Sequence, residues 1–155
     1  MGTLAVTWYQ WFLFFHILAA TMWVGGGLAL TVLSLSAKRA GREQELILVR
    51  LGTTIGGPFF GVAGMALLGF GIALVENGNW DWSTFFVIFG LIAWAWSAAV
   101  GIFYYGPEQQ RIDAALGRGD EASVSRLLAR FHRVGQIDSL VLVVAVFVMT
   151  AKPWL

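Results

Sequence analysis

The chain contains no cysteine among its 155 residues. This absence excludes disulfide bonds, thiolate metal sites and iron–sulfur clusters, because all of them require cysteine sulfur. Charged residues make up only 12% of the chain, whereas soluble domains contain roughly 25%. The net charge of +1 gives no indication of nucleic-acid binding. What remains is 58% hydrophobic, with a mean hydropathy of +0.74, and predicts an integral membrane protein with a single domain over 1–155.

Four apolar segments are long enough to cross a bilayer, which requires about 20 residues. They cover 8–36, 51–75, 83–105 and 134–151. The connections 37–50 and 106–133 contain nine of the ten basic residues, and cytoplasmic loops are enriched in such residues. We therefore expect an all-α membrane protein of the cell's inner (plasma) membrane. It would be a bundle of four antiparallel transmembrane helices with cytoplasmic basic loops and both termini extracytoplasmic.

The connection 106–133 is amphipathic, because its apolar residues recur at helical spacing. It predicts a helical extension of the third span, a turn at Gly117–Asp120, and a helix that leads into the fourth span. Its arginines would either lie against anionic lipid headgroups or belong to a solvated connector.

His16 is the only histidine that lies well inside a predicted span. An imidazole in hydrocarbon must face the protein interior, and Ala20, Trp23 and Gly27 share its helical face. Neutral imidazole is a frequent ligand of metals and of haem iron. His16 is therefore a candidate metal ligand, and these three neighbours are candidates to line a pocket for haem b. The alternative is a buried hydrogen bond.

A second iron ligand would have to lie at the same depth as His16. His132, at the cytoplasmic start of the fourth span, lies too deep by nearly 20 Å on a scale of about 1.5 Å per residue. Met65 in the second span matches the depth of His16 and is the candidate partner. Alternatively, Met65 only fills space between helices.

Asp138 is the one carboxylate predicted to lie within a span. It could be a proton or ion site, since intramembrane acids commonly serve transport. The alternative is a buried pair with Arg50, Arg133 or His132 that fixes the register of the helices.

Glycines are concentrated in the second span and include the G-x-x-x-G sequence of Gly57 and Gly61. Small residues allow close packing of membrane helices within one chain, with a membrane-protein partner, or with a second copy. They could also make room for a flat macrocycle.

The opening Phe15-His16, followed by Trp23-Val-Gly25-Gly26, resembles a bacterial family of small integral membrane proteins of unknown function. The closing Met149-Thr-Ala-Lys152-Pro153 resembles the same family, which implies a four-helix bundle. The opening and the ending are more distantly similar to the four-helix membrane protoporphyrinogen oxidase, and the opening to CopD-like membrane domains of copper-resistance proteins.

In the oxidase family the first-span histidine takes part in haem binding and activity, a role that corresponds to His16 here. A lysine of the third span also matters in that family. The segment 83–105 contains no lysine, histidine or acid, which argues against the oxidase activity and leaves haem binding open.

Three functions remain as hypotheses, and none of them assigns a catalytic residue. The first is an accessory or assembly subunit of a larger membrane complex, such as a respiratory or redox complex, in contact with lipid. The second is a redox-linked protein that binds haem b, with His16 as axial ligand. The third is a small transporter whose polar path includes His16 and Asp138.

Overall fold

The computed structural model describes residues 7–152, and this part of the chain is helical without any strand. Pro153, which belongs to the closing motif, lies outside the described residues. The elements follow one another as α1 (Trp8–Ala20), the π-helical turn η1 (Thr21–Gly25), α2 (Gly26–Ala40), α3 (Arg42–Thr54), α4 (Gly56–Asn77), α5 (Phe85–Val100), the π-helical turn η2 (Gly101–Tyr105), α6 (Gly106–Gly117) and α7 (Glu121–Ala151).

Four helical runs are long and apolar enough to cross a membrane, which confirms the predicted number of spans and makes this a multi-pass membrane protein. They are Trp8–Ala40, Gly56–Asn77, Phe85–Gly117 and Glu121–Ala151. A run of 33 residues is about 50 Å long, whereas the hydrocarbon core measures about 30 Å. The longer runs therefore continue beyond the hydrocarbon core.

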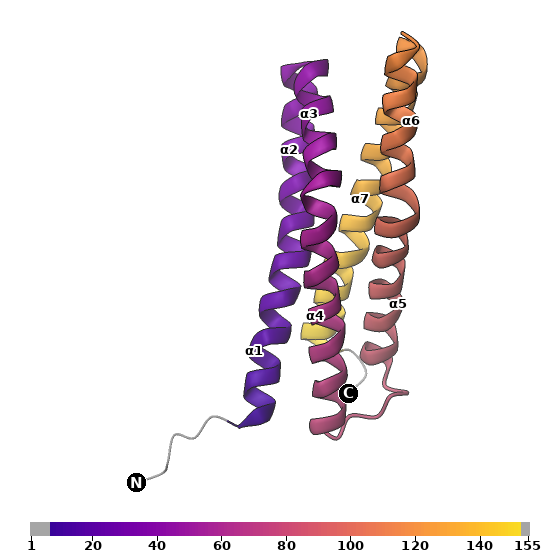
Figure 1. Ribbon diagram of the computed structural model, residues 1–155. Coiled ribbons are helices and arrows are strands. Elements are labelled where there is room, and N and C mark those ends of the chain that lie inside the picture. The colour runs from indigo at the N-terminus through magenta and orange to yellow at the C-terminus, as the bar shows by residue number, and fades with distance from the viewer. Residues whose placement is uncertain (1–6, 153–155) are drawn as a thin grey trace.

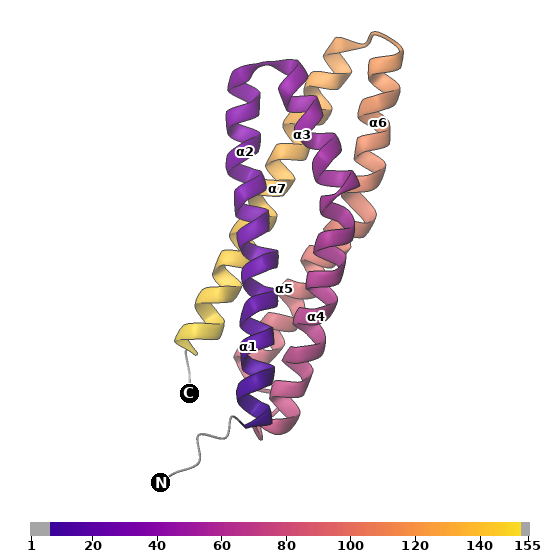
Figure 2. The ribbon, with the colours of Figure 1, turned by 60° about the vertical axis from the view of Figure 1, so that its left-hand side comes forward.

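The α2–α3 and α6–α7 turns lie at one end of the molecule (Figures 1 and 2). We call this end the basic end, because Lys38, Arg39, Arg42, Arg118 and Arg126 lie in or next to these turns. The α4–α5 connection, the start of α1 and the end of α7 lie at the opposite end (Figure 1).

The second span begins at Gly56 rather than at the expected Leu51. Helix α3 first continues to Thr54, and the helix is interrupted at Ile55 before α4 begins. Pro58 explains the interruption, since proline has no N–H to donate to the carbonyl of the preceding turn.

The predicted helix–turn–helix of 106–133 is confirmed, with α6 ending at Gly117 and α7 starting at Glu121. A tight turn between them places Gly119 at φ +68°, a left-handed conformation that glycine adopts without strain. The apolar faces of α6 and α7 pack on each other and on Val49 of α3. This basic-end core consists of Val49, Ile112, Ala115, Val124 and Leu128, each at most 3% exposed. The apolar side chains of the connection are therefore buried within the protein, while its arginines surround them.

The half of the molecule opposite the basic end contains α1, α4 and α5, and we call it the membrane half. It is packed around tryptophan and glycine. Trp23 lies so close to Gly64 that an added Cβ there would be 2.8 Å from the indole ring. Trp94 of α5 meets Trp23 edge to face at 6.4 Å and donates its Nε1–H to the Gly64 carbonyl at 2.9 Å. Many other large apolar side chains of this half, such as Val62 and Phe103, are exposed and suited to contact lipid.

Candidate functional site

His16 of α1 is held against α4 by one hydrogen bond. Its Nδ1 lies 3.1 Å from the backbone carbonyl of Leu67, and because a carbonyl only accepts, Nδ1 carries the hydrogen. Gly71 lies opposite the ring, where an added Cβ would be 3.2 Å from the imidazole Cε1. The lack of a side chain at Gly71 therefore makes room for the imidazole.

The Nε2 atom of His16 makes no hydrogen bond with any residue in 7–152. In the neutral ring a hydrogen on Nδ1 leaves the lone pair on Nε2. Histidines that bind metals commonly have this arrangement, with the other ring nitrogen donating to a carbonyl that fixes tautomer and orientation. The geometry serves equally as a simple connection between α1 and α4.

The neighbours expected to line a pocket with His16 have different surroundings. Trp23 is buried, at 6% exposure, and Trp94 and Gly64 occupy the space beside its ring. Ala20 and Gly27 are only partly buried. The residues that contact Trp23 come from α4 and α5, which no pattern within the first span could have revealed.

Met65 does not face His16. The Met65 side chain is 63% exposed. Met65 precedes Leu67 by two residues, and this spacing places the two residues about 200° apart around the axis of α4. Met65 therefore faces outward, away from the side of α4 that receives His16.

His132 lies at the basic end, where its Nδ1 is 3.4 Å from Glu45 Oε1. This contact joins α7 to α3, and both side chains are largely buried. The other ring nitrogen of His132 is buried without a hydrogen-bond partner among the described residues. Glu45 lies in the connection 37–50, and no sequence pattern distinguishes it there from Glu43, because its partner belongs to a segment distant in the chain.

Asp138 is paired with none of the three proposed cationic partners. Arg50 instead forms an exposed ion pair with Asp113 at 2.8 Å, and Arg133 is exposed. The Ser97 hydroxyl of α5 donates to Asp138 Oδ2 at 3.1 Å. The other carboxyl oxygen of Asp138 is buried without a partner in 7–152.

Ser139, the next residue of α7, is 2.9 Å from the hydroxyl of Thr31 in α2. Asp138 and Ser139 thus connect α7 to α5 and α2 through the hydroxyl groups of Ser97 and Thr31. Serine and threonine hydroxyls are common in apolar helices, and only the tertiary structure identifies these as partners.

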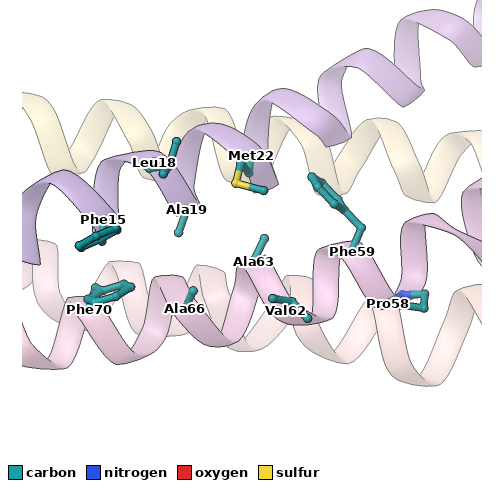
Figure 3. A pocket seen from close by; sticks show the side chains of 10 residues that line it. All are labelled: Phe15, Leu18, Ala19, Met22, Pro58, Phe59, Val62, Ala63, Ala66 and Phe70. Carbon is teal, nitrogen blue, oxygen red and sulfur yellow. The ribbon is translucent and has the colours of Figure 1, made fainter.

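An apolar groove lies between the first and second spans (Figure 3). We call it the α1–α4 groove; its volume is about 460 Å³. Its small residues are Ala19, Ala63 and Ala66. At one end of the groove the rings of Phe15 and Phe70 stack with their centroids 5.1 Å apart. The ten lining residues are Phe15, Leu18, Ala19, Met22, Pro58, Phe59, Val62, Ala63, Ala66 and Phe70.

His16 is not among the lining residues of this groove. No cluster of three or more His, Cys, Asp or Glu side chains that could hold a metal ion occurs in 7–152. Any iron or other metal at His16 would therefore need ligands from outside this part of the chain or from a cofactor.

Comparison with known proteins adds no relative: no protein-family model, no curated protein and no solved structure matches this chain.

Proposed function

We propose that this chain is an accessory or assembly subunit of a larger membrane complex, and that the α1–α4 groove receives a transmembrane helix of the partner. The proposed protein is a bundle of four antiparallel spans in the bacterial plasma membrane. Its basic end is cytoplasmic, and both termini are extracytoplasmic. The observation that carries the proposal is the groove itself.

The composition of the groove suits a helix better than a polar ligand. All ten lining side chains are apolar, so the groove offers a ligand no side-chain hydrogen bond. Helices in lipid associate by close packing over small residues, because lipid tails are as apolar as leucine and supply no hydrophobic driving force. Ala66 is partly exposed and offers such a contact, whereas Ala19 and Ala63 are buried between α1 and α4; the surrounding aromatic rings increase the contact area.

A second surface of α4 is also available to a partner. Gly57 and Gly61 are exposed, and an added Cβ at either position would have no neighbour within 4 Å. This G-x-x-x-G pair is therefore not used for packing inside the described part of the chain, although such pairs commonly support helix contacts.

The proposal is tested by photocrosslinking in native membranes. A photoreactive amino acid replaces Val62, a groove residue that is 75% exposed, and, as the control, Ile102 of η2, which is 68% exposed. We expect a discrete protein adduct from position 62 and mainly lipid adducts from position 102. The substitution Ala66→Leu should abolish the adduct by filling the groove, whereas Ala95→Leu on the exposed side of α5 should not. Lipid adducts alone from position 62 would refute a helical partner.

Haem binding is the second candidate, and His16 is the observation that favours it. Its Nε2 carries no hydrogen bond from any residue in 7–152, and its orientation is fixed through the Leu67 carbonyl, as expected of an axial ligand. Haem b, when bound, would supply a redox-active iron. Met65 faces away, so His16 would be the only ligand from the described residues that the arrangement offers.

The spectrum of the purified protein tests this candidate. Cells supplied with a haem precursor should yield a protein with a Soret band that shifts on reduction. The band should disappear in His16→Ala and persist in His132→Ala, because His132 is engaged by Glu45 at the basic end. A colourless protein with full helicity would exclude haem binding.

A further inference from the structure

A basic pocket lies between α6 and the start of α7, beyond the membrane half. Its volume is about 360 Å³, and three of its six lining residues are arginines. The lining consists of Arg111, Ala114, Arg118, Ser123, Arg126 and Leu127. We propose that this pocket binds the phosphate group of a small soluble molecule.

Two of the three arginines are held in place by the protein. Arg111 Nη1 lies 2.9 Å from Glu108 Oε2, and the Glu108 side chain is completely buried. Arg126 Nη2 donates to the Ser123 hydroxyl at 3.0 Å. Anchored guanidinium groups lose less conformational freedom on binding, so these two contacts prepare the pocket for an anion.

The backbone N–H of Arg118 donates to the Ala115 carbonyl at 3.2 Å, but its guanidinium group forms no hydrogen bond or ion pair with any residue in 7–152. It lies in the turn between α6 and α7, and Asp120 attracts it only at longer range. The Asp120 carboxylate itself accepts the backbone N–H of Ser123. The guanidinium of Arg118 thus remains available to a ligand.

The charges of the pocket favour a phosphate. Arg111, Arg118 and Arg126 line it, and the carboxylates that interact with these arginines are Glu108, which is paired with Arg111, and Asp120, which caps α7. The net charge of these five side chains is positive. The planar guanidinium group can also form paired hydrogen bonds to two oxygens of a phosphate.

The position of the pocket distinguishes a soluble ligand from a lipid headgroup. Helix α6 continues η2, so Arg118 lies about 20 Å beyond Tyr105, the last residue of the apolar segment, at 1.5 Å per residue. The headgroup layer adds only about 5 to 8 Å on each side of the hydrocarbon core. The outer part of the pocket is therefore beyond the reach of lipid phosphates in the same membrane.

Calorimetric titration with inorganic pyrophosphate tests the proposal on the full-length protein in phosphatidylcholine nanodiscs. We expect saturable binding that weakens at higher salt and falls about tenfold or more in Arg118→Gln, since hydrogen bonds to charged groups have this magnitude. The matched control is Arg39→Gln, which removes the same charge from the exposed surface of α2 at the same end of the molecule.

Arg118 is chosen because its replacement leaves no buried charge unpaired, and an unchanged unfolding temperature verifies that the variant is folded. Absence of saturable binding to the unaltered protein would overturn the proposal. Equal weakening by Arg39→Gln would also overturn it, because the attraction would then be general. Loss of pyrophosphate binding in phosphatidylglycerol nanodiscs, at a salt concentration that screens their surface charge and still permits binding in phosphatidylcholine nanodiscs, would show that lipid headgroups reach the pocket and would overturn the assignment to a soluble ligand.

Discussion

At the scale of single residues, His16, Leu67 and Gly71 form one interlocked contact between the first and second spans. The imidazole donates to the Leu67 carbonyl, and the missing side chain of Gly71 accommodates the ring. The contact stabilises the helix pair whether or not Nε2 also binds a ligand. Its structural role can therefore be measured separately from any cofactor.

The replacement His16→Ala should lower the free energy of unfolding by about 1 to 2 kcal/mol, because it removes an interhelical hydrogen bond and leaves a void. Gly71→Ala should also destabilise the protein, since the new Cβ would press on the ring at 3.2 Å. Gly69→Ala is the control, as a Cβ there meets nothing within 4 Å. Unfolding titrations in mild detergent measure all three, and equal effects at positions 69 and 71 would contradict the contact.

At the scale of elements, α6 and the start of α7 pack their apolar faces against α3, and the amphipathic connection 106–133 thereby forms a buried core. Ile112 is 0% exposed at its centre, whereas Ile102, in the apolar turn η2, is 68% exposed. The same residue type thus occurs in two environments along one continuous helical run.

The substitution Ile112→Ala should lower the free energy of unfolding by about 2 to 5 kcal/mol, the usual cost of such a truncation in a protein core. The matched change Ile102→Ala should stay within about 0.5 kcal/mol, because its side chain contacts few protein atoms. Thermal unfolding of the two variants in the same detergent provides the comparison. Similar losses would mean that the basic-end core is not a stabilising core.

The start of α7 should respond to acid through Asp120. Hydrogen bonds from the Ser123 side chain and backbone lower the pKa of Asp120 below its ordinary value of 3.8. A lowered pKa in the folded state stabilises the fold at pH above the unfolded value, and this contribution is lost as the pH falls through the folded pKa. The first turn of α7 should therefore loosen below about pH 4.

Hydrogen exchange of the Ser123 amide, corrected for intrinsic rates, measures this loosening. In Asp120→Asn the amide should remain capped without the acid dependence, since asparagine also caps helices but does not titrate. A persistent acid response in that variant would assign the effect to another group.

At the scale of the whole molecule, the two halves are stabilised in different ways. The basic end has a core of side chains at most 3% exposed, while the membrane half exposes many large apolar residues along its helices. A bilayer can cover these residues, and it also sets the orientation of the molecule. The proposed orientation, with the basic end in the cytoplasm, follows from the positive-inside rule.

The absence of native cysteine allows a direct test of this orientation. Single replacements Ser83→Cys, near the α4–α5 connection, and Ser125→Cys, at the basic end, are both at exposed positions. A membrane-impermeant maleimide should label position 83 in spheroplasts and position 125 only after lysis. Labelling in the opposite order would reverse the proposed topology.

The site was less predictable from sequence than the fold. His16 was identified as a polar residue facing the protein, and the tertiary structure placed it against Leu67 and Gly71 rather than near Met65. Asp138 was expected beside a cation and is bonded to Ser97. Lateral partners depend on how each helix is rotated, and helices that are apolar on nearly all sides carry little information about rotation.

Local composition and periodicity are enough to predict the four spans, the two basic connections and the helix–turn–helix of 106–133. Three features depend instead on contacts between distant segments or on the observed backbone: α3, α6 and α7 share a core, Pro58 delays the second span to Gly56, and α1 and α4 enclose an apolar groove. The physical reason is that helix formation is satisfied within one segment, whereas burial, grooves and hydrogen-bond partners require side chains from segments distant in the chain.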